Sequence, residues 1–231
     1  DIPTKHPSVI PPREECVLPA MLETRAQRYG DKPFIVFEGD EQWTYSQASR
    51  IARETAAALQ RLGIKRSEPV LVWLPSTSEI VRIHFGLCYL GGIFVPINLA
   101  LRGRVLQHVI VDSGATTLIC HADLAPRLES ISLGALNRIV ILDGPANGPL
   151  PLDYLDSNVL EGCADDFVEP SPPVAPWEPH GIFYTSGTTG RSKGVIAPHL
   201  HTAMHSRCCF RFFQEDDRFL MNLPYFHMGG V

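Results

Sequence analysis

The chain has 231 residues, of which 45% are hydrophobic and 19% charged, and its formal net charge is −5. This balance is typical of a globular protein, because a disordered chain has fewer apolar residues and a larger net charge. The mildly acidic chain has no long run of Lys or Arg to bind a phosphate backbone, so we expect no nucleic-acid partner.

Six scattered cysteines form no C-x-x-C pair, which predicts reduced thiols, buried as small apolar side chains, in a cytoplasmic protein. Residues 1–5 lack the apolar region of a secretory signal. Residues 83–101 contain no Asp, Glu, Lys or Arg and approach the length of a membrane span. Because Gly91, Gly92 and Pro96 interrupt this stretch, we predict a helix, a turn and a short strand instead.

Helical and strand patterns alternate from residue 46 to residue 142. Residues 46–62 carry an apolar stripe at helical spacing, and Gly63 follows as a stop signal. Residues 70–74 are a continuous apolar run, typical of a strand covered on both faces. Further helices are predicted at 76–90, 102–112 and 122–131, and strands at 93–95, 117–120 and 138–142. Before them, a hairpin is predicted from 34–37 and 42–44. The alternation predicts an α/β fold with a largely parallel sheet and flanking helices.

The amino-acid composition changes at residues 145–179, where eight of 35 residues are proline. This composition predicts an extended connector rather than a helix. We therefore divide the chain into an α/β subdomain (1–144), the proline-rich connector (145–179), and the start of a further α/β segment (180–231). In the last part, strands are predicted at 181–184, 195–198 and 220–223. Because a domain seldom ends on Gly-Gly just after an apolar strand, we expect the printed chain to be the first part of a longer protein.

The most informative stretch is residues 184–194, which read Tyr-Thr-Ser-Gly-Thr-Thr-Gly-Arg-Ser-Lys-Gly directly after a predicted strand. Glycines allow a tight turn in which successive N–H groups converge on an anion. Small hydroxyls can donate to phosphate oxygens or help to hold Mg²⁺, and Lys193 supplies a charge-assisted contact. The composition of this loop therefore predicts a polyphosphate ligand.

The loop differs from the common P-loop, in which Gly, four residues and Gly-Lys-Ser/Thr open a helix. Here Gly187 and Gly190 are three residues apart, and an apolar run resembling a strand follows Lys193. The loop is therefore predicted to join two strands. The plain alternative is a polar surface hairpin without a ligand.

The string at 185–194 resembles the phosphate-binding signature of the adenylate-forming superfamily, which contains acyl-CoA synthetases, peptide-synthetase adenylation domains and luciferases. Residues 43–46 (Trp-Thr-Tyr-Ser), 90–98 (Leu-Gly-Gly-Ile-Phe-Val-Pro-Ile-Asn) and 223–227 (Leu-Pro-Tyr-Phe-His) are similar to further elements of that superfamily. The resemblance covers nearly everything after about residue 19. It implies that the chain is the first part of the large N-terminal domain of such an enzyme, inactive by itself.

The resemblance implies a reaction in two steps. A carboxylate attacks the α-phosphorus of ATP to give an acyl-adenylate and pyrophosphate, and a thiol, usually that of coenzyme A, then displaces AMP. Because the nucleophile is already anionic, the protein mainly positions reactants and neutralises phosphate charge. The implied phosphate-binding residues, with Lys193 also catalytic and Thr188 also holding Mg²⁺, are Thr185, Ser186, Gly187, Thr188, Thr189, Gly190 and Lys193.

His227 follows Pro-Tyr-Phe, and the resemblance implies a catalytic, substrate-binding residue beside the acyl group. The alternative is a buried histidine bonded to a backbone carbonyl. Ser192 stands where most members of the superfamily have proline, which would narrow φ. From this difference we expect a modest loss of preorganisation and no loss of function.

Three functions remain open. Residues 96–98 (Pro-Ile-Asn) and 226–227 (Phe-His) resemble acyl- and aryl-CoA ligases and favour transfer to coenzyme A. The second is an adenylation domain that loads a carrier-protein thiol, and the third is a nucleotide-binding fragment without turnover. His199, His201 and His205 have the spacing of metal ligands, but no Glu or Cys set completes them apart from Cys208 and Cys209. The acid itself is not identified by the sequence.

Overall fold

The computed structural model describes residues 10–39, 41–185 and 191–231. Its strands are β1 (Pro33–Val36), β2 (Gln42–Thr44), β3 (Pro69–Trp73), β4 (Ile93–Pro96), β5 (Thr117–His121), β6 (Arg138–Leu142), β7 (Tyr154–Asp156), β8 (Pro179–Thr185) and β9 (Lys193–Pro198). The α-helices are α1 (Arg13–Cys16), α2 (Leu18–Tyr29), α3 (Tyr45–Arg61), α4 (Ser78–Leu90), α5 (Gly103–Asp112) and α6 (His199–Cys209). The 3₁₀ helices are η1 (Ala125–Leu128), η2 (Ser157–Leu160), η3 (Ala164–Asp166) and η4 (Met228–Gly230).

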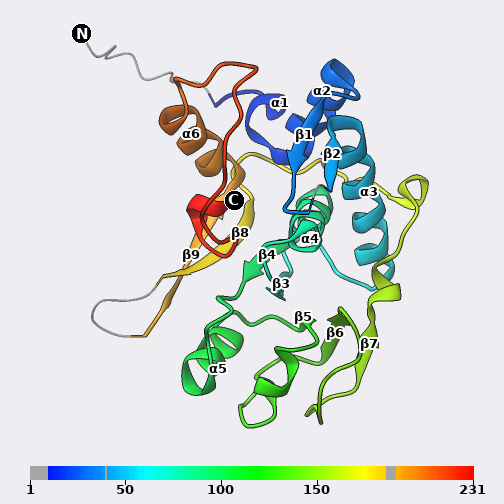
Figure 1. The fold of residues 1–231 in the computed structure, drawn as a ribbon, viewed down its shortest axis with the longest axis vertical. Coiled ribbons are helices and arrows are strands. Elements are labelled where there is room, and N and C mark those ends of the chain that lie inside the picture. The colour runs from blue at the N-terminus through cyan, green and yellow to red at the C-terminus, as the bar shows by residue number, and fades with distance from the viewer. Residues whose placement is uncertain (1–9, 40, 186–190) are drawn as a thin grey trace.

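Seven strands form one sheet in the order β7-β6-β5-β3-β4-β8-β9, and β1 pairs with β2 in a separate hairpin (Figure 1). Strands β3 to β8 are parallel, and only β9 runs antiparallel, against β8. The predicted α/β fold with a largely parallel sheet is confirmed. The first crossover places β4 on one side of β3, and the next places β5 on the other side.

The central strand β3 is covered on both faces, as its unbroken apolar run predicts. Val70 and Val72 pack into the cluster beneath α3 and α4, whereas Leu71 and Trp73 face the cluster beneath α5. All four side chains are fully buried. Successive side chains of a strand point to opposite faces, so β3 joins the two halves of the hydrophobic core.

Local sequence signals explain where α3 begins and where α4 ends, the two helices that cover one face of the sheet. Thr44 and Gln47 form a capping box that satisfies free N–H groups at the start of α3. Helix α4 ends at Gly91, whose φ of 76° lies in the left-handed region that glycine tolerates. The apolar stretch at 83–101 is therefore helix, turn and strand, as predicted. No helix in the described ranges is both long and apolar enough to cross a membrane.

Two predicted elements are wrong. The helix predicted over 122–131 is a single 3₁₀ turn, η1, because Pro126 restricts the helix to its own first turn. Residues 220–223 form no strand, and Leu220 is 83% exposed. Within the described ranges no strand pairs with this apolar run, and an isolated strand leaves its ladder hydrogen bonds unmade.

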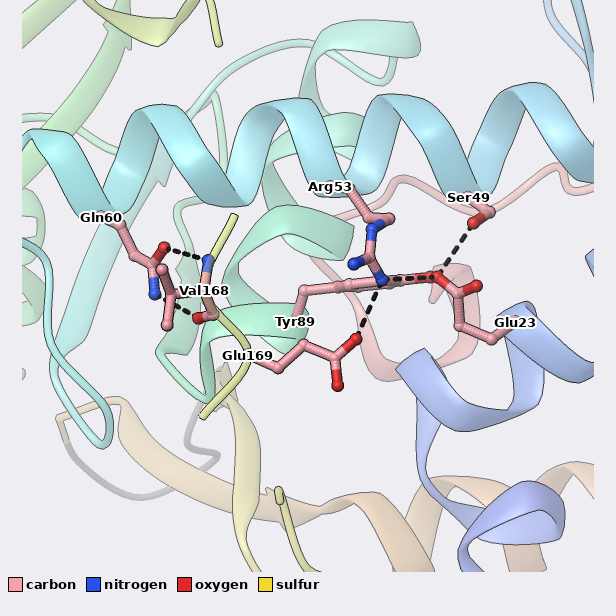
Figure 2. Close-up of polar contacts among 7 residues, drawn as sticks. All are labelled: Glu23, Ser49, Arg53, Gln60, Tyr89, Val168 and Glu169. Atoms are coloured by element: carbon pink, nitrogen blue, oxygen red, sulfur yellow. Dashed lines mark hydrogen bonds and ion pairs between the residues drawn. The ribbon is translucent and has the colours of Figure 1, made fainter. Parts of the chain in front are cut away.

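The proline-rich segment is docked on the body of the protein rather than free. Strand β7 extends the sheet edge beside β6. The Gln60 side chain exchanges hydrogen bonds of 2.7 and 3.1 Å with the backbone of Val168, and Arg53 pairs with Glu169 at 3.0 Å (Figure 2). Strand β8 then enters the same sheet beside β4. The proposed division into subdomains at 144 and 180 stays a prediction.

The sequence predicted buried cysteines, and only half of them are buried. Within the described residues all six thiols are free. Cys16, Cys88 and Cys120 are buried as expected, but Cys163, Cys208 and Cys209 are exposed. The exposed thiols lie in a connecting loop and at the end of α6, where no apolar layer covers them.

Candidate nucleotide-binding site

The candidate phosphate loop joins β8 to β9, two strands, as the sequence predicts. Strand β8 is parallel to β4, with Gly181 opposite Phe94, and it continues for four more residues to Thr185. Figure 1 shows this hairpin extending beyond the neighbouring strands. The loop therefore leaves the carboxyl end of a parallel strand, where ligands bind in open α/β sheets.

The two ends of the loop are held together by strand pairing. Thr185 lies opposite Lys193, and the Thr185 hydroxyl is 3.5 Å from the Lys193 carbonyl oxygen. Both residues are exposed. The ammonium of Lys193 is therefore available to an anion at the mouth of the loop. The other predicted phosphate ligands, Ser186, Gly187, Thr188, Thr189 and Gly190, lie outside the described residues.

Helix α5 braces the base of the loop. The His108 ring bonds to the Ser192 carbonyl through Nε2 at 2.7 Å, and the Tyr184 hydroxyl donates to Asp112 at 2.8 Å. Burial, and then the hydrogen bond and charge of Asp112, raise the pKa of Tyr184. The hydroxyl therefore keeps its proton and acts as a donor at neutral pH. These two contacts bridge 84 and 72 residues of chain, so no local pattern indicates them.

Gly194 permits close packing just after the loop. A Cβ atom at this position would lie 2.8 Å from Cγ2 of Ile182 and 3.3 Å from the Tyr184 ring. Any larger residue would therefore displace β8 side chains. The glycine is thus explained by packing between the two strands, not by a left-handed backbone conformation.

The second candidate segment, which contains His227, is anchored through Tyr225. The Tyr225 N–H donates to the Ser76 hydroxyl at 3.0 Å, and its phenol lies 2.9 Å from Nδ1 of His84. Ser76 follows β3, so the anchor places this segment at the carboxyl edge of the sheet. Ser76 lies two residues before α4, and its hydroxyl serves this long-range contact.

His227 itself is exposed, and its ring centroid is 4.6 Å from that of Phe226. The alternative of a buried histidine is therefore wrong. Strands β3 and β8 are separated only by β4, a lateral distance of about 10 Å at usual strand spacing. Both candidate segments thus leave the same edge of the sheet.

The three histidines of α6 do not lie on one face of the helix. His199 is buried, at 3% exposure, whereas His201 and His205 are exposed. The rings of His201 and His205 stack with centroids 6.4 Å apart on the outer face of the helix. His201 and His205 thus share an exposed face of the helix, whereas the buried His199 lies on another face.

Several known proteins are similar to this chain in sequence and in architecture. Residues 22–231 match the family described as AMP-binding enzyme. The long-chain-fatty-acid–CoA ligase FadD13 of Mycobacterium tuberculosis is 30% identical over 83% of this chain and 37% of its own length. The phosphinothricin tripeptide synthetase PhsC of Streptomyces viridochromogenes is 30% identical over 89% of this chain and 18% of its own.

A solved structure of the anthranilate CoA ligase AuaEII in complex with anthranoyl-AMP superposes with a TM-score of 0.71. It is 28% identical, and the match covers 82% of this chain and 36% of that one. The chain belongs to the AMP-binding enzyme family of adenylate-forming proteins. It spans less than half the length of these relatives.

Proposed function

We propose that the protein is an acid–thiol ligase, which activates a carboxylic acid with ATP and transfers the acyl group to coenzyme A. The single observation that supports this most strongly is the position of the loop signature. The Thr185–Lys193 pair closes a glycine- and hydroxyl-rich loop at the carboxyl end of β8. Family membership and the similarity to two CoA ligases point in the same direction.

The proposed chemistry needs charge neutralisation more than proton transfer. A carboxylate oxygen attacks the α-phosphorus, the bond to the bridging oxygen of pyrophosphate breaks, and pyrophosphate leaves with the electron pair. Lys193 would neutralise charge that accumulates on the β- and γ-phosphates, and the loop N–H groups would donate to their oxygens. In the second step the thiol sulfur attacks the acyl carbon and AMP leaves.

Mg²⁺ held at this loop would lower the negative charge of the phosphates. The donor chemistry fits, because a hard cation takes hydroxyl oxygens, phosphates and water as ligands. We propose Thr188, inside the loop, as the residue that supplies a hydroxyl. Its neighbours at 185–190 are hydroxyl residues and glycines, so bulky apolar side chains are absent from this part of the sequence.

Replacing Lys193 tests the proposed role of the loop. Charge-assisted hydrogen bonds contribute about 1.5–3 kcal/mol each, so Lys193→Ala should slow acid-dependent pyrophosphate exchange by about 10- to 100-fold. The assay requires the full-length protein with ATP, Mg²⁺ and a panel of carboxylic acids. Lys65→Ala is the matched control, because Lys65 is equally exposed and follows α3, away from the loop. Equal rates in the two variants would contradict the proposal.

A carrier-protein thiol is the second candidate acceptor of the acyl group. The similarity to PhsC, a tripeptide synthetase, supports this alternative. Both acceptors use the same adenylate, so pyrophosphate exchange does not separate them. Thioester formation does: free coenzyme A and a phosphopantetheinyl carrier protein are offered in parallel. We expect turnover with coenzyme A. Turnover with the carrier alone would assign the protein to the second class.

The remaining partners follow from this chemistry. The substrate is a small-molecule carboxylic acid, and the cytoplasm supplies ATP and coenzyme A together. The free thiols of the described chain agree with a reducing compartment. We therefore propose a cytoplasmic enzyme.

A further inference from the structure

A second cluster of reactive side chains lies in the core, beneath the candidate nucleotide site. His84 and Cys88 are four residues apart on α4 and therefore share one face of the helix. His180 joins them from β8. All three are buried, and one nitrogen or sulfur atom of each lies within 4.8 Å of the other two.

The spacing of these three atoms is close to that of a tetrahedral metal site. Bonds of about 2.0–2.3 Å from zinc to nitrogen and sulfur place neighbouring ligand atoms about 3.3–3.8 Å apart. Nε2 of His84 and Nδ1 of His180 are already 3.2 Å apart. The Cys88 sulfur lies within 4.8 Å of both nitrogens, so an ion would replace the hydrogen bond between the rings and draw the sulfur closer.

The outward nitrogens of the two rings are held by hydroxyl groups. Nδ1 of His84 lies 2.9 Å from the Tyr225 phenol, and Nε2 of His180 lies 2.6 Å from the Thr202 hydroxyl. Metal-bound histidines usually have such a partner on the other nitrogen, which fixes the tautomer and the ring orientation. Each ring thus presents one nitrogen to the cluster and has the other occupied.

A further buried histidine, His199, adjoins the cluster and has a nitrogen left unsatisfied by the described part of the chain. His199 packs beside it, with its ring centroid 5.2 Å from that of His180. Within the described residues, Nε2 of His199 is a buried side-chain nitrogen without a hydrogen-bond partner. Such an unsatisfied group is costly in a protein interior, and its ring lies beside that of His180.

We propose that His84, Cys88 and His180 form a zinc site in the core. Two imidazoles and a thiolate are a donor set that zinc prefers. Both rings are buried, and their outer nitrogens are held by the Tyr225 and Thr202 hydroxyls, which leaves the inner nitrogens to face the cluster. On binding, the Cys88 thiol gives its proton to solvent and its sulfur bonds to Zn²⁺.

The proposed zinc joins α4 to β8, the strand that leads into the phosphate loop. Its role is structural, because the three ligands are buried and the closed core leaves little access for a substrate. Zinc that binds only the folded state raises its stability. The site is independent of the proposed ligase activity, since neither its ligands nor its readouts involve ATP or an acid.

The full-length protein, expressed with added zinc and freed of loosely bound metal, tests the proposal by elemental analysis. We expect about one zinc per chain, and its loss in Cys88→Ala. The matched control is the double variant His205→Ala with Cys209→Ala, because this exposed pair on α6 has the same four-residue spacing. The control should retain its zinc.

Cobalt provides a readout that does not depend on how well the variants fold. Apo wild-type protein titrated with Co²⁺ should gain the near-ultraviolet absorption of a thiolate–cobalt bond, and its melting temperature should rise by several degrees. Cys88→Ala should show neither change. Absence of the band in wild-type protein would overturn the proposal, as would zinc lost from the α6 double variant but retained in Cys88→Ala.

Discussion

At the scale of single residues, the side chain of His227 is exposed, while the nearby Tyr225 is anchored to the body of the protein. Tyr225, two residues earlier, is held by Ser76 and His84, whereas the His227 ring stays accessible beside Phe226. A side chain that is exposed but attached to an anchored backbone can contact a substrate without contributing to the core. We therefore keep His227 as a proposed substrate-binding and catalytic residue.

His227→Ala should lower the rate of adenylate formation or of thiol transfer by about fivefold or more, the effect of losing roughly 1 kcal/mol at the transition state. The two half-reactions are measured separately under single-turnover conditions. Thermal stability should change by no more than about 0.5 kcal/mol, as for an exposed position. His205→Ala, on the outer face of α6, is the matched control. Unchanged rates in both half-reactions would remove His227 from the site.

The residues of the proposed phosphate loop are a prediction from sequence alone, made possible because their signal is local. Glycines, hydroxyls and a lysine within eleven positions indicate an anion site without any knowledge of the fold. The residues that support the loop are different in kind. His108 and Asp112 contact it from α5, and both look like ordinary polar positions of an amphipathic helix.

At the scale of elements, the docking of the proline-rich segment depends on Gly162. A Cβ atom there would lie 2.1 Å from the Glu54 carbonyl oxygen and 3.0 Å from the Ala58 nitrogen. Both are backbone atoms of α3, which cannot move aside without disturbing the helix. Only glycine therefore allows the segment to approach α3 so closely.

Gly162→Ala should lower the free energy of unfolding by about 1–3 kcal/mol, the usual cost of overpacking. Chemical denaturation of the full-length protein measures this loss. Cys163→Ala is the matched control, because Cys163 is adjacent but exposed, and it should be nearly neutral. A Gly162→Ala protein as stable as the wild type would show that the segment is not tightly docked.

Most helices and strands were predictable because the spacing of apolar residues along the chain follows which side chains are buried. The runs at 70–74 and 138–142 are buried strands, and the stripe at 46–62 is α3. The docking of residues 145–179 was not predictable, because its contacts with α3 span more than 100 residues. The helix predicted at 122–131 is absent because Pro126 limits it to one turn, although Ala125 and Leu128 are buried. The strand predicted at 220–223 is absent for a different reason. An apolar pattern shows that burial is favourable, but a neighbouring element must supply the cover.

At the scale of the whole molecule, the sheet order explains how distant segments meet. Strand β8 returns beside β4 after the chain has built β5, β6 and β7 on the other side of β3. This return brings His180 to α4 and places the phosphate loop at the same edge as the Tyr225 segment. Neither meeting follows from sequence spacing, since 96 residues separate His84 from His180.

The central claim is that the protein forms acyl-adenylates, and pyrophosphate exchange by the full-length enzyme tests it most directly. Wild-type protein is incubated with ATP, Mg²⁺ and labelled pyrophosphate, with and without each acid of a chemically varied panel. The account predicts label entering ATP only when a particular acid is present. The claim would be contradicted if folded protein bound the nucleotide but exchanged no label with any acid of the panel. The protein would then be a nucleotide-binding protein without ligase activity.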